Sequence, residues 1–285
     1  ARLEARWLLR RGKHMFSTNM KSLTGFCLPA VNFTLNTYCK KSAFILLIFL
    51  YIISSVQAQS SSPYQFSKNK TLALTLGSIA FSVGGQLTQN TVKPLIEADR
   101  LGLDRMNIPA FERSVSYNWR PKVAKASDWV FMGAVLLPGT LLAFKPIRQD
   151  IGKPVILGIQ TLTIGYGITG FTKALVRRNR PFTFIQNSGD PLLIEKQLER
   201  DSRFSFFSGH TSLTAASAFM GAKMYVDYYP QSSARPWVWA GAAILPAVVG
   251  YMRVRSGKHF ISDVIAGYLV GGAVGILVPH LQKAR

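Results

Sequence analysis

Acidic residues and cysteines are scarce in this sequence. The first scarcity leaves the chain strongly basic, and the second argues against a disulfide-rich fold. Thirteen Asp and Glu stand against 34 Lys and Arg, which gives a formal net charge of +21. Both cysteines, Cys27 and Cys39, lie in the first 58 residues. A mature chain without that part would have no thiol and no disulfide framework.

Charge of either sign is sparse as well, and this favours a membrane protein. Only 16% of the residues are charged and 48% are hydrophobic, a profile typical of chains that lie in lipid. The excess of basic residues fits either anionic lipid surfaces or nucleic acid. Because these residues lie in short loops between apolar runs, and no basic stripe with interleaved aromatics is present, we expect a bilayer and no nucleic acid as partner.

The amino-terminal part differs from the rest of the chain. Residues 1–38 form an upstream tail that we expect to lie outside the fold, with Met15 and Met20 as candidate start residues. Residues 39–58, "CKKSAFILLIFLYIISSVQA", combine lysines, an apolar core and small residues before a cleavage site, as in a secretory signal. An uncleaved anchor helix is the alternative. Residues 59–285 then form the membrane domain.

Six apolar segments follow Gln59. Several are close to the ~17–20 residues that a spanning helix needs, and they are rich in small residues that permit close helix packing. The first is the weakest and has an interfacial helix as its alternative. We therefore predict an all-α membrane bundle of about six helices, over residues 71–87, 128–144, 154–175, 210–226, 237–252 and 261–280.

Polar residues that are hard to explain as surface occur in three clusters. In the first, "KALVRRNRP", Lys173 and Arg180 are seven residues apart, and Pro181 predicts that the helix ends at Arg180. Cations that complement a helix carboxyl end are the ordinary alternative. In the second, "FFSGHTS", Ser208 is a good N-cap, and a helix amino terminus with free N–H groups binds anions. Simple capping with an incidental His210 is the alternative there.

The third cluster is "RVRSGKHFISD", residues 253–263. If a helix begins at His259, then His259 and Asp263 are four residues apart and share a face. Asp263 would then accept a proton from one ring nitrogen and leave the other free to attack. The alternative is an interfacial helix start with an acidic first turn. If the helices span, all three clusters emerge on one side of the membrane, and together they predict an anion site at one end of the bundle.

The three clusters resemble the signatures of the type 2 phosphatidic acid phosphatase family, which shares a site with vanadium haloperoxidases. The family patterns are K-x6-R-P, P-S-G-H and S-R-x5-H-x3-D. This chain has all three in the same order, with Phe207 in place of the proline and Met252 in place of the serine. Neither position supplies chemistry in the family.

The resemblance implies a phosphatase that acts through a phosphohistidine on a lipid phosphate monoester or diphosphate. His259 would be the nucleophile, Asp263 its orienting partner and His210 the general acid. The phosphate would be bound by Lys173, Arg180, Ser208, Gly209 and Arg253. Fixed cations make a metal redundant, so we expect no metal and no cofactor.

The expected substrates are amphiphilic: phosphatidic acid, phosphatidylglycerol phosphate, a polyprenyl diphosphate or a lipid A phosphate. We expect the inner membrane, with the site facing the periplasm or exterior, and residues 182–207 as a lid over it. Three alternatives remain open: a soluble acid phosphatase, a vanadate-dependent haloperoxidase, and a lipid-phosphate binder without activity.

Overall fold

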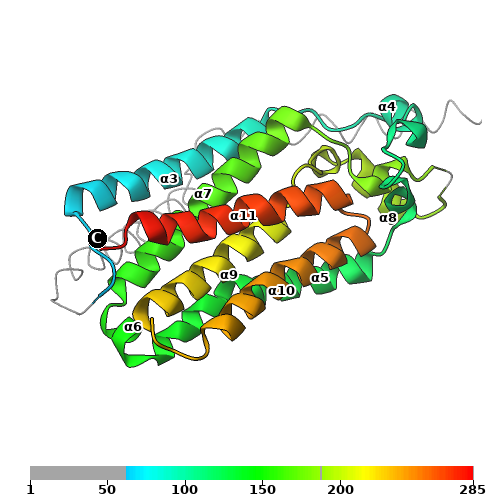
Figure 1. Ribbon diagram of the computed structural model, residues 1–285. Coiled ribbons are helices and arrows are strands. Elements are labelled where there is room, and N and C mark those ends of the chain that lie inside the picture. Colours follow the sequence, from blue (N-terminus) through cyan, green and yellow to red (C-terminus); the bar gives the residue numbers. More distant parts are fainter. Residues whose placement is uncertain (1–61, 187, 285) are drawn as a thin grey trace, which may run out of the picture. The chain divides into compact units, whose positions relative to one another are not determined.

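Six long helices follow the six apolar segments of the sequence (Figure 1). They are α3 (Lys68–Asn90), α5 (Pro121–Leu136), α7 (Gly152–Val176), α9 (Gly209–Tyr228), α10 (Arg235–Arg255) and α11 (Ile261–Leu281). The computed structural model describes residues 62–186 and 188–284, and within these the sole β pairing is an isolated bridge between Tyr64 and Lys283. The predicted all-α bundle is therefore confirmed for the described residues.

Short helices connect the long ones. A 3-10 turn, η4 (Leu137–Ala143), continues α5, and α6 (Lys145–Gln149) leads into α7. The two long connections also contain short helices: α4 (Glu97–Leu101), η2 (Arg105–Asn107), η3 (Arg113–Tyr117), η5 (Pro181–Phe184), α8 (Pro191–Leu198) and η6 (Arg200–Arg203).

Five of the long helices are long and apolar enough to cross a membrane, and α9 is the one that is not. The chain is an integral membrane protein. Helix α9 is enclosed by α11, α10, α7 and α5, and 13 of its 20 residues are buried. An inner helix presents little surface to lipid, so it can carry Ser, Thr and Gly where the outer helices need apolar side chains.

Glycines bring α11 directly against the backbone of α9. A Cβ on Gly271 would lie 2.0 Å from the Ser212 carbonyl oxygen, and a Cβ on Gly267 would lie 2.6 Å from that of Ser208. Only glycine permits this approach. The close contact fixes the start of α11 beside the start of α9.

Helix α3 runs in the same direction as α7 and packs along it. The Gln160 side chain donates to Thr75 Oγ1 at 2.8 Å, and the Thr163 hydroxyl donates to Ser78 Oγ at 2.8 Å. Helix α3 has 23 residues and is one of the five candidate spans. The first apolar segment therefore has the length and packing of a bundle helix, not those of an interfacial one.

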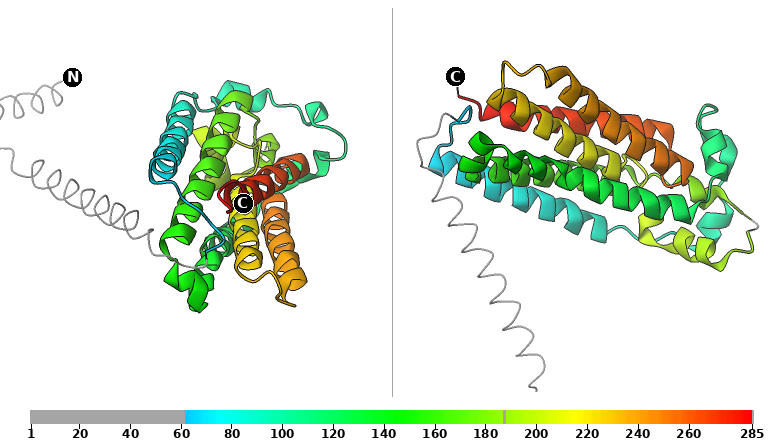
Figure 2. Two further views of the ribbon diagram at one scale, coloured as in Figure 1. Left: turned by 60° about the vertical axis from the view of Figure 1, so that its left-hand side comes forward. Right: turned by 90° about the horizontal axis from the view of Figure 1, so that it is seen from below.

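The two ends of the bundle carry different helix termini and different polar contacts. At one end α3, α7 and α10 finish while α5, α9 and α11 begin; we call it the site end (Figure 2). Helices α4 and α8 lie beyond it (Figure 1). At the opposite end Tyr64 donates to Asp227 at 2.9 Å and Lys283 pairs with the same carboxylate at 2.7 Å. Both ends of the described chain are thus held far from the site end.

Three predictions concern residues outside the described ranges: the tail over 1–38, the signal or anchor over 39–58, and the two cysteines. They stay predictions.

Candidate active site

The three polar clusters meet at the site end. An Arg180 Nη atom lies 3.4 Å from His259 Nε2, and the Ser208 amide donates to the Asp263 carbonyl at 3.0 Å. A Cβ on Gly209 would lie 3.5 Å from Lys173 Nζ, so the absence of a side chain there lets the ammonium group approach the start of α9. The convergence expected from the connectivity is present.

Arg180 is held rigidly in a buried position. Helix α7 ends at Val176 with Arg177 in the left-handed region (φ 50°), four residues before the expected end, and Arg180 is extended ahead of Pro181. Its side chain is 4% exposed. The guanidinium donates to the Asp201 backbone oxygen at 2.8 Å, to Asp201 Oδ1 at 2.7 Å and to the Lys258 carbonyl at 3.2 Å.

Helix α9 begins as the sequence predicts. Ser208 is its N-cap and is fully buried, and its hydroxyl oxygen accepts from the Thr211 hydroxyl at 2.9 Å. The Thr211 amide donates to the same hydroxyl oxygen, and the positive end of the helix dipole lies beside the cations and histidines.

His259 lies in the turn before α11, which begins at Ile261. Its Nδ1 is 2.7 Å from the Ser205 carbonyl oxygen. Because a carbonyl can only accept, Nδ1 carries the ring proton, and the lone pair of Nε2 accepts from Arg180 Nη1 at 3.4 Å. Burial, together with Arg180, Arg253 and Lys173, holds the pKa of His259 well below its usual value. The site thus contains a neutral imidazole whose Nε2 faces a cation.

Asp263 does not contact His259 in the way the i, i+4 spacing suggests. Its carboxylate is 3.7 Å from His259 Nδ1, too far for a hydrogen bond. It accepts instead from the Ser205 hydroxyl at 2.5 Å, from the Phe260 amide at 2.8 Å and from Arg178 at 2.6 Å. Asp263 therefore fixes the segment whose carbonyl fixes His259, and it caps α11.

Arg178 was missed by the sequence reasoning. Its guanidinium joins Asp263 to the buried Glu112 at 2.6 Å each, and it lies 4.2 Å from the centre of the Phe260 ring. The neighbouring Arg180 matched a family signature, whereas nothing in the local pattern separates Arg178 from the other cations around it.

Arg253 and His210 share a carboxylate from α5. Arg253 donates to Ser127 Oγ at 2.9 Å and to Asp128 Oδ1 at 2.8 Å, and the same Oδ1 lies 2.9 Å from His210 Nε2. The Phe131 ring centre is 4.5 Å from that of His210. The sequence reasoning missed Asp128, although an acidic residue near the start of an apolar helix is itself a signal of function.

Lys258 adds a further cation beside the site. Its ammonium lies 4.8 Å from the centre of the Phe182 ring and 5.8 Å from that of Trp119. Burial and the nearby Arg180 lower the pKa of Lys258 to about 8. Burial alone would raise the pKa of Asp201, but the charges of Arg180 and Lys173 outweigh this effect and hold the pKa well below its usual value.

A cavity of about 450 Å³ lies beside part of the site, and His259, Arg180 and Arg253 are not among its lining residues. Its polar wall includes Lys173, His210 and Asp201, and the far wall combines aromatic and aliphatic side chains with carboxamides of α3. The aromatic, aliphatic and carboxamide side chains that line it include those of Gln86, Gln89, Asn90, Phe131, Tyr166 and Leu213. This cavity therefore combines cationic groups with apolar side chains.

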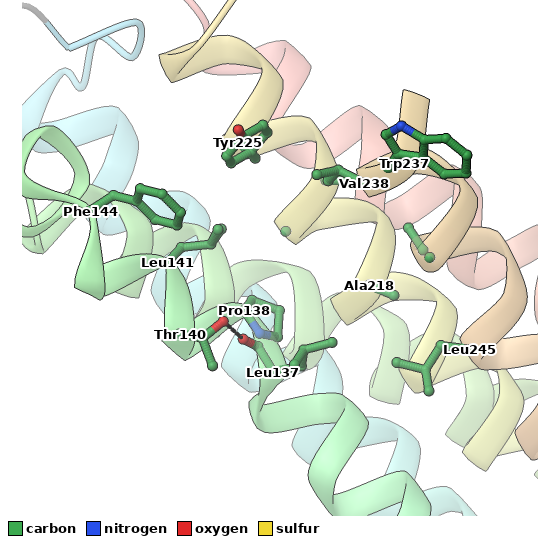
Figure 3. A pocket seen from close by; sticks show the side chains of 14 residues that line it. Leu137, Pro138, Thr140, Leu141, Phe144, Ala218, Tyr225, Trp237, Val238 and Leu245 are labelled. Carbon is green, nitrogen blue, oxygen red and sulfur yellow. Dashed lines mark hydrogen bonds between the residues drawn. The ribbon is translucent and has the colours of Figure 1, made fainter. Parts of the chain in front are cut away.

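A second cavity, of about 320 Å³, lies between η4, α9 and α10 and is apolar (Figure 3). The Thr140 hydroxyl in it donates to the Leu137 carbonyl at 2.7 Å, and the Tyr225 hydroxyl lies 2.9 Å from Ser232 Oγ. None of the residues singled out above lines it. Among the described residues, no group of three or more His, Cys, Asp and Glu is placed to hold a metal ion.

Comparison with known proteins assigns the second half of the chain to a family. Residues 155–285 match the PAP2 superfamily, so the chain carries a PAP2 superfamily domain. Phospholipid phosphatase 1 of Rattus norvegicus is 35% identical over 88 residues, which are 29% of this chain and 30% of that protein. Phosphatidylglycerophosphatase B of Bacillus subtilis is 32% identical over 87 residues, 30% of this chain and 43% of that protein.

Undecaprenyl-diphosphatase of Sulfolobus acidocaldarius is 27% identical over 143 residues, 50% of this chain and 60% of that protein. The chain thus spans between about a third and three fifths of these curated relatives. A solved structure of a transmembrane PAP2-type phosphatidylglycerolphosphate phosphatase from Bacillus subtilis aligns with a TM-score of 0.41 at 19% identity. The alignment covers 84% of this chain and 94% of that one.

Proposed function

We propose that the chain hydrolyses a lipid phosphate monoester or diphosphate through a phosphohistidine intermediate on His259. The observation that carries the proposal is the state of this imidazole: Nδ1 is held by the Ser205 carbonyl at 2.7 Å, and Nε2 faces Arg180 at 3.4 Å. A phosphate bound to the cations would place its phosphorus in front of a neutral, oriented nucleophile.

The chemical steps follow from this placement. Nε2 of His259 attacks phosphorus, the N–P bond forms, and the bond to the leaving oxygen breaks in line. His210 gives its proton to that oxygen as general acid. Water then attacks the phosphohistidine, the N–P bond breaks, inorganic phosphate leaves, and His210 takes up the proton of the water.

Charge stabilisation is the task of the surrounding donors. The transferred phosphoryl group carries its charge on the equatorial oxygens, and phosphoryl transfer depends chiefly on positioning and electrostatics. Lys173, Arg180 and Arg253 would bind these oxygens together with Ser208 and the first N–H groups of α9. Three fixed cations supply the charge that a divalent ion supplies in other phosphotransfer enzymes, so we expect no metal requirement.

The cavity supports an amphiphilic substrate. Its cationic wall suits the phosphate, and its aromatic and aliphatic wall suits the first part of a lipid tail. Phosphatidic acid, phosphatidylglycerol phosphate, a polyprenyl diphosphate and a lipid A phosphate share these two features. The five apolar helices favour this class over a soluble acid phosphatase or haloperoxidase.

The test is phosphate release from lipid phosphates in detergent, with and without EDTA. We expect turnover by the wild type that persists in EDTA, and no turnover by His259→Ala. His280→Ala is the matched control, because this histidine is exposed at the opposite end of α11 and its loss should leave activity unchanged. Turnover by a folded His259→Ala protein would refute the covalent route, and restoration of EDTA-treated enzyme by magnesium would refute the metal-independent chemistry.

A further inference from the structure

One face of α5 lies behind the candidate site. Phe131 is four residues after Ser127 and three after Asp128, so it neighbours both on the helix surface. Ser127 and Asp128 contact Arg253, at 2.9 Å and 2.8 Å, while Asp128 and Phe131 contact His210. Helix α5 precedes the segment 155–285 that matches the PAP2 superfamily, and none of the three signatures includes it.

The contacts to Arg253 occupy one edge of its guanidinium. Nη1 donates to both Ser127 and Asp128, whereas Nε is buried without a hydrogen-bond partner. The whole side chain is 4% exposed. Because a buried donor is costly to leave unpaired, this free edge suits an anion that enters the site, and α5 holds the opposite edge.

The contact to His210 places a carboxylate against its ring. His210 Nε2 lies 2.9 Å from Asp128 Oδ1, a distance that suits an ion pair when the ring is protonated. Burial, Arg253, His259, Lys173 and Arg180 lower the pKa of His210 far below its usual value. A general acid must carry a proton, and a carboxylate in contact with the ring offsets the cations that oppose that charge.

We infer that Asp128 is a positioning residue for this reaction: it holds the general acid His210 and the phosphate ligand Arg253 in place through a single carboxylate oxygen. The inference rests on the proposed phosphatase function. Asp128 itself does not touch the reacting atoms. Its side chain is 55% exposed, so removing the charge should leave the helix packing intact.

The experiment compares two substrates that differ in their leaving group. A lipid phosphate releases an alkoxide that needs a proton, whereas p-nitrophenyl phosphate releases a phenolate that does not. We expect Asp128→Asn to lower kcat/KM about 10- to 100-fold on the lipid phosphate, by analogy with the loss found when the carboxylate partner of a metal-bound histidine is removed. The loss on the aryl phosphate should be several-fold smaller.

Two further variants separate the two contacts of Asp128. Ser127→Ala removes a contact to Arg253 but none to His210, so it should lower kcat/KM equally on both substrates. In a His210→Ala background, Asp128→Asn should also lower both equally, because the acid is already absent. Lys125→Gln removes an exposed charge from the same helix and should change neither.

Other outcomes overturn the inference. An equal loss on both substrates for Asp128→Asn would show that the residue does not act through the acid. A rise in kcat/KM, or tighter inhibition by vanadate, would show that the carboxylate competes with phosphate for the site. Absence of phosphate release from either substrate by the wild type would refute the proposed function, and the inference would fall with it.

Discussion

His259 and His210 lie in the same ring of cations, yet the proposed reaction requires opposite charge states of them. The nucleophile must be neutral, and the cations favour this state. The acid must be protonated, and the cations oppose it until the negative charge of a bound phosphate offsets them. Substrate binding would therefore charge His210 at the moment when its proton is needed.

The two histidines can be separated by leaving group. His210→Ala should lower kcat/KM on a lipid monoester by ~10²–10⁴-fold, the usual contribution of general acid catalysis, and by less on p-nitrophenyl phosphate. His259→Ala should abolish turnover of both, because every substrate requires the nucleophile. Steady-state kinetics of each variant in the same detergent measures this. Equal losses for His210→Ala on both substrates would mean that it only binds phosphate.

The charge state of His259 can be observed directly. Its lowered pKa means that protonation begins only when the pH falls well below 6.5, so the ring should be neutral at pH 6 in the free protein. Nitrogen NMR of histidine-labelled protein in detergent reports this state, and His259→Ala assigns the signal. An imidazolium signal for His259 at pH 6 would contradict the proposed electrostatics.

At the scale of helices, the contact between α9 and α11 determines whether the site assembles. Ser208 and His210 lie at the start of α9, and His259 and Asp263 flank the start of α11. The glycines of α11 place these two starts side by side. Local sequence predicts each helix separately, but their relative position depends on this backbone contact.

Gly271→Ala should therefore lower both stability and activity. Its Cβ would lie 2.0 Å from the Ser212 carbonyl oxygen, and overpacking of this kind costs roughly 1–3 kcal/mol. Gly77→Ala is the matched control, because a Cβ there meets nothing within 4 Å and alanine favours a helix more than glycine does. Thermal unfolding in detergent and kcat/KM are the measurements. A Gly271→Ala protein as stable and active as the control would show that the helices adjust without cost.

For the whole molecule, the predicted secretory signal and the predicted outward-facing site require opposite orientations of the bundle, so both cannot be correct. The described chain begins and ends at the end opposite the site. A secretory signal would place the residues after it outside, and α3 would then carry the chain to a site that faces the cytoplasm. The family resemblance favours a site on the outer face.

Cysteine labelling decides between them. In a variant with Cys27 and Cys39 replaced, Gly189→Cys introduces an exposed thiol at the site end and Ser233→Cys one at the opposite end. We expect an impermeant maleimide to label Gly189→Cys in intact cells and to spare Ser233→Cys. The reverse pattern would place the site in the cytoplasm and support the signal prediction.

The sequence by itself determined the six helices and the three clusters that meet. Helix bounds could be predicted because apolar runs, Ser208 and Pro181 act within a few residues of their own position. Two bounds departed from the prediction: α5 begins at Pro121, seven residues before the predicted segment 128–144, and the chain leaves α7 at Arg177, where no proline or glycine marks the change.

Only the tertiary structure decided which partners the functional side chains have. Asp263 is four residues from His259, yet His259 is held by the Ser205 carbonyl, 54 residues away. Arg253 is held by Asp128, 125 residues away, on a helix that no signature marks. Hydrogen bonds form between whichever donors and acceptors the packed helices bring within about 3 Å. Spacing along the chain fixes such neighbours only within one helix, and His259 lies just outside the helix that contains Asp263.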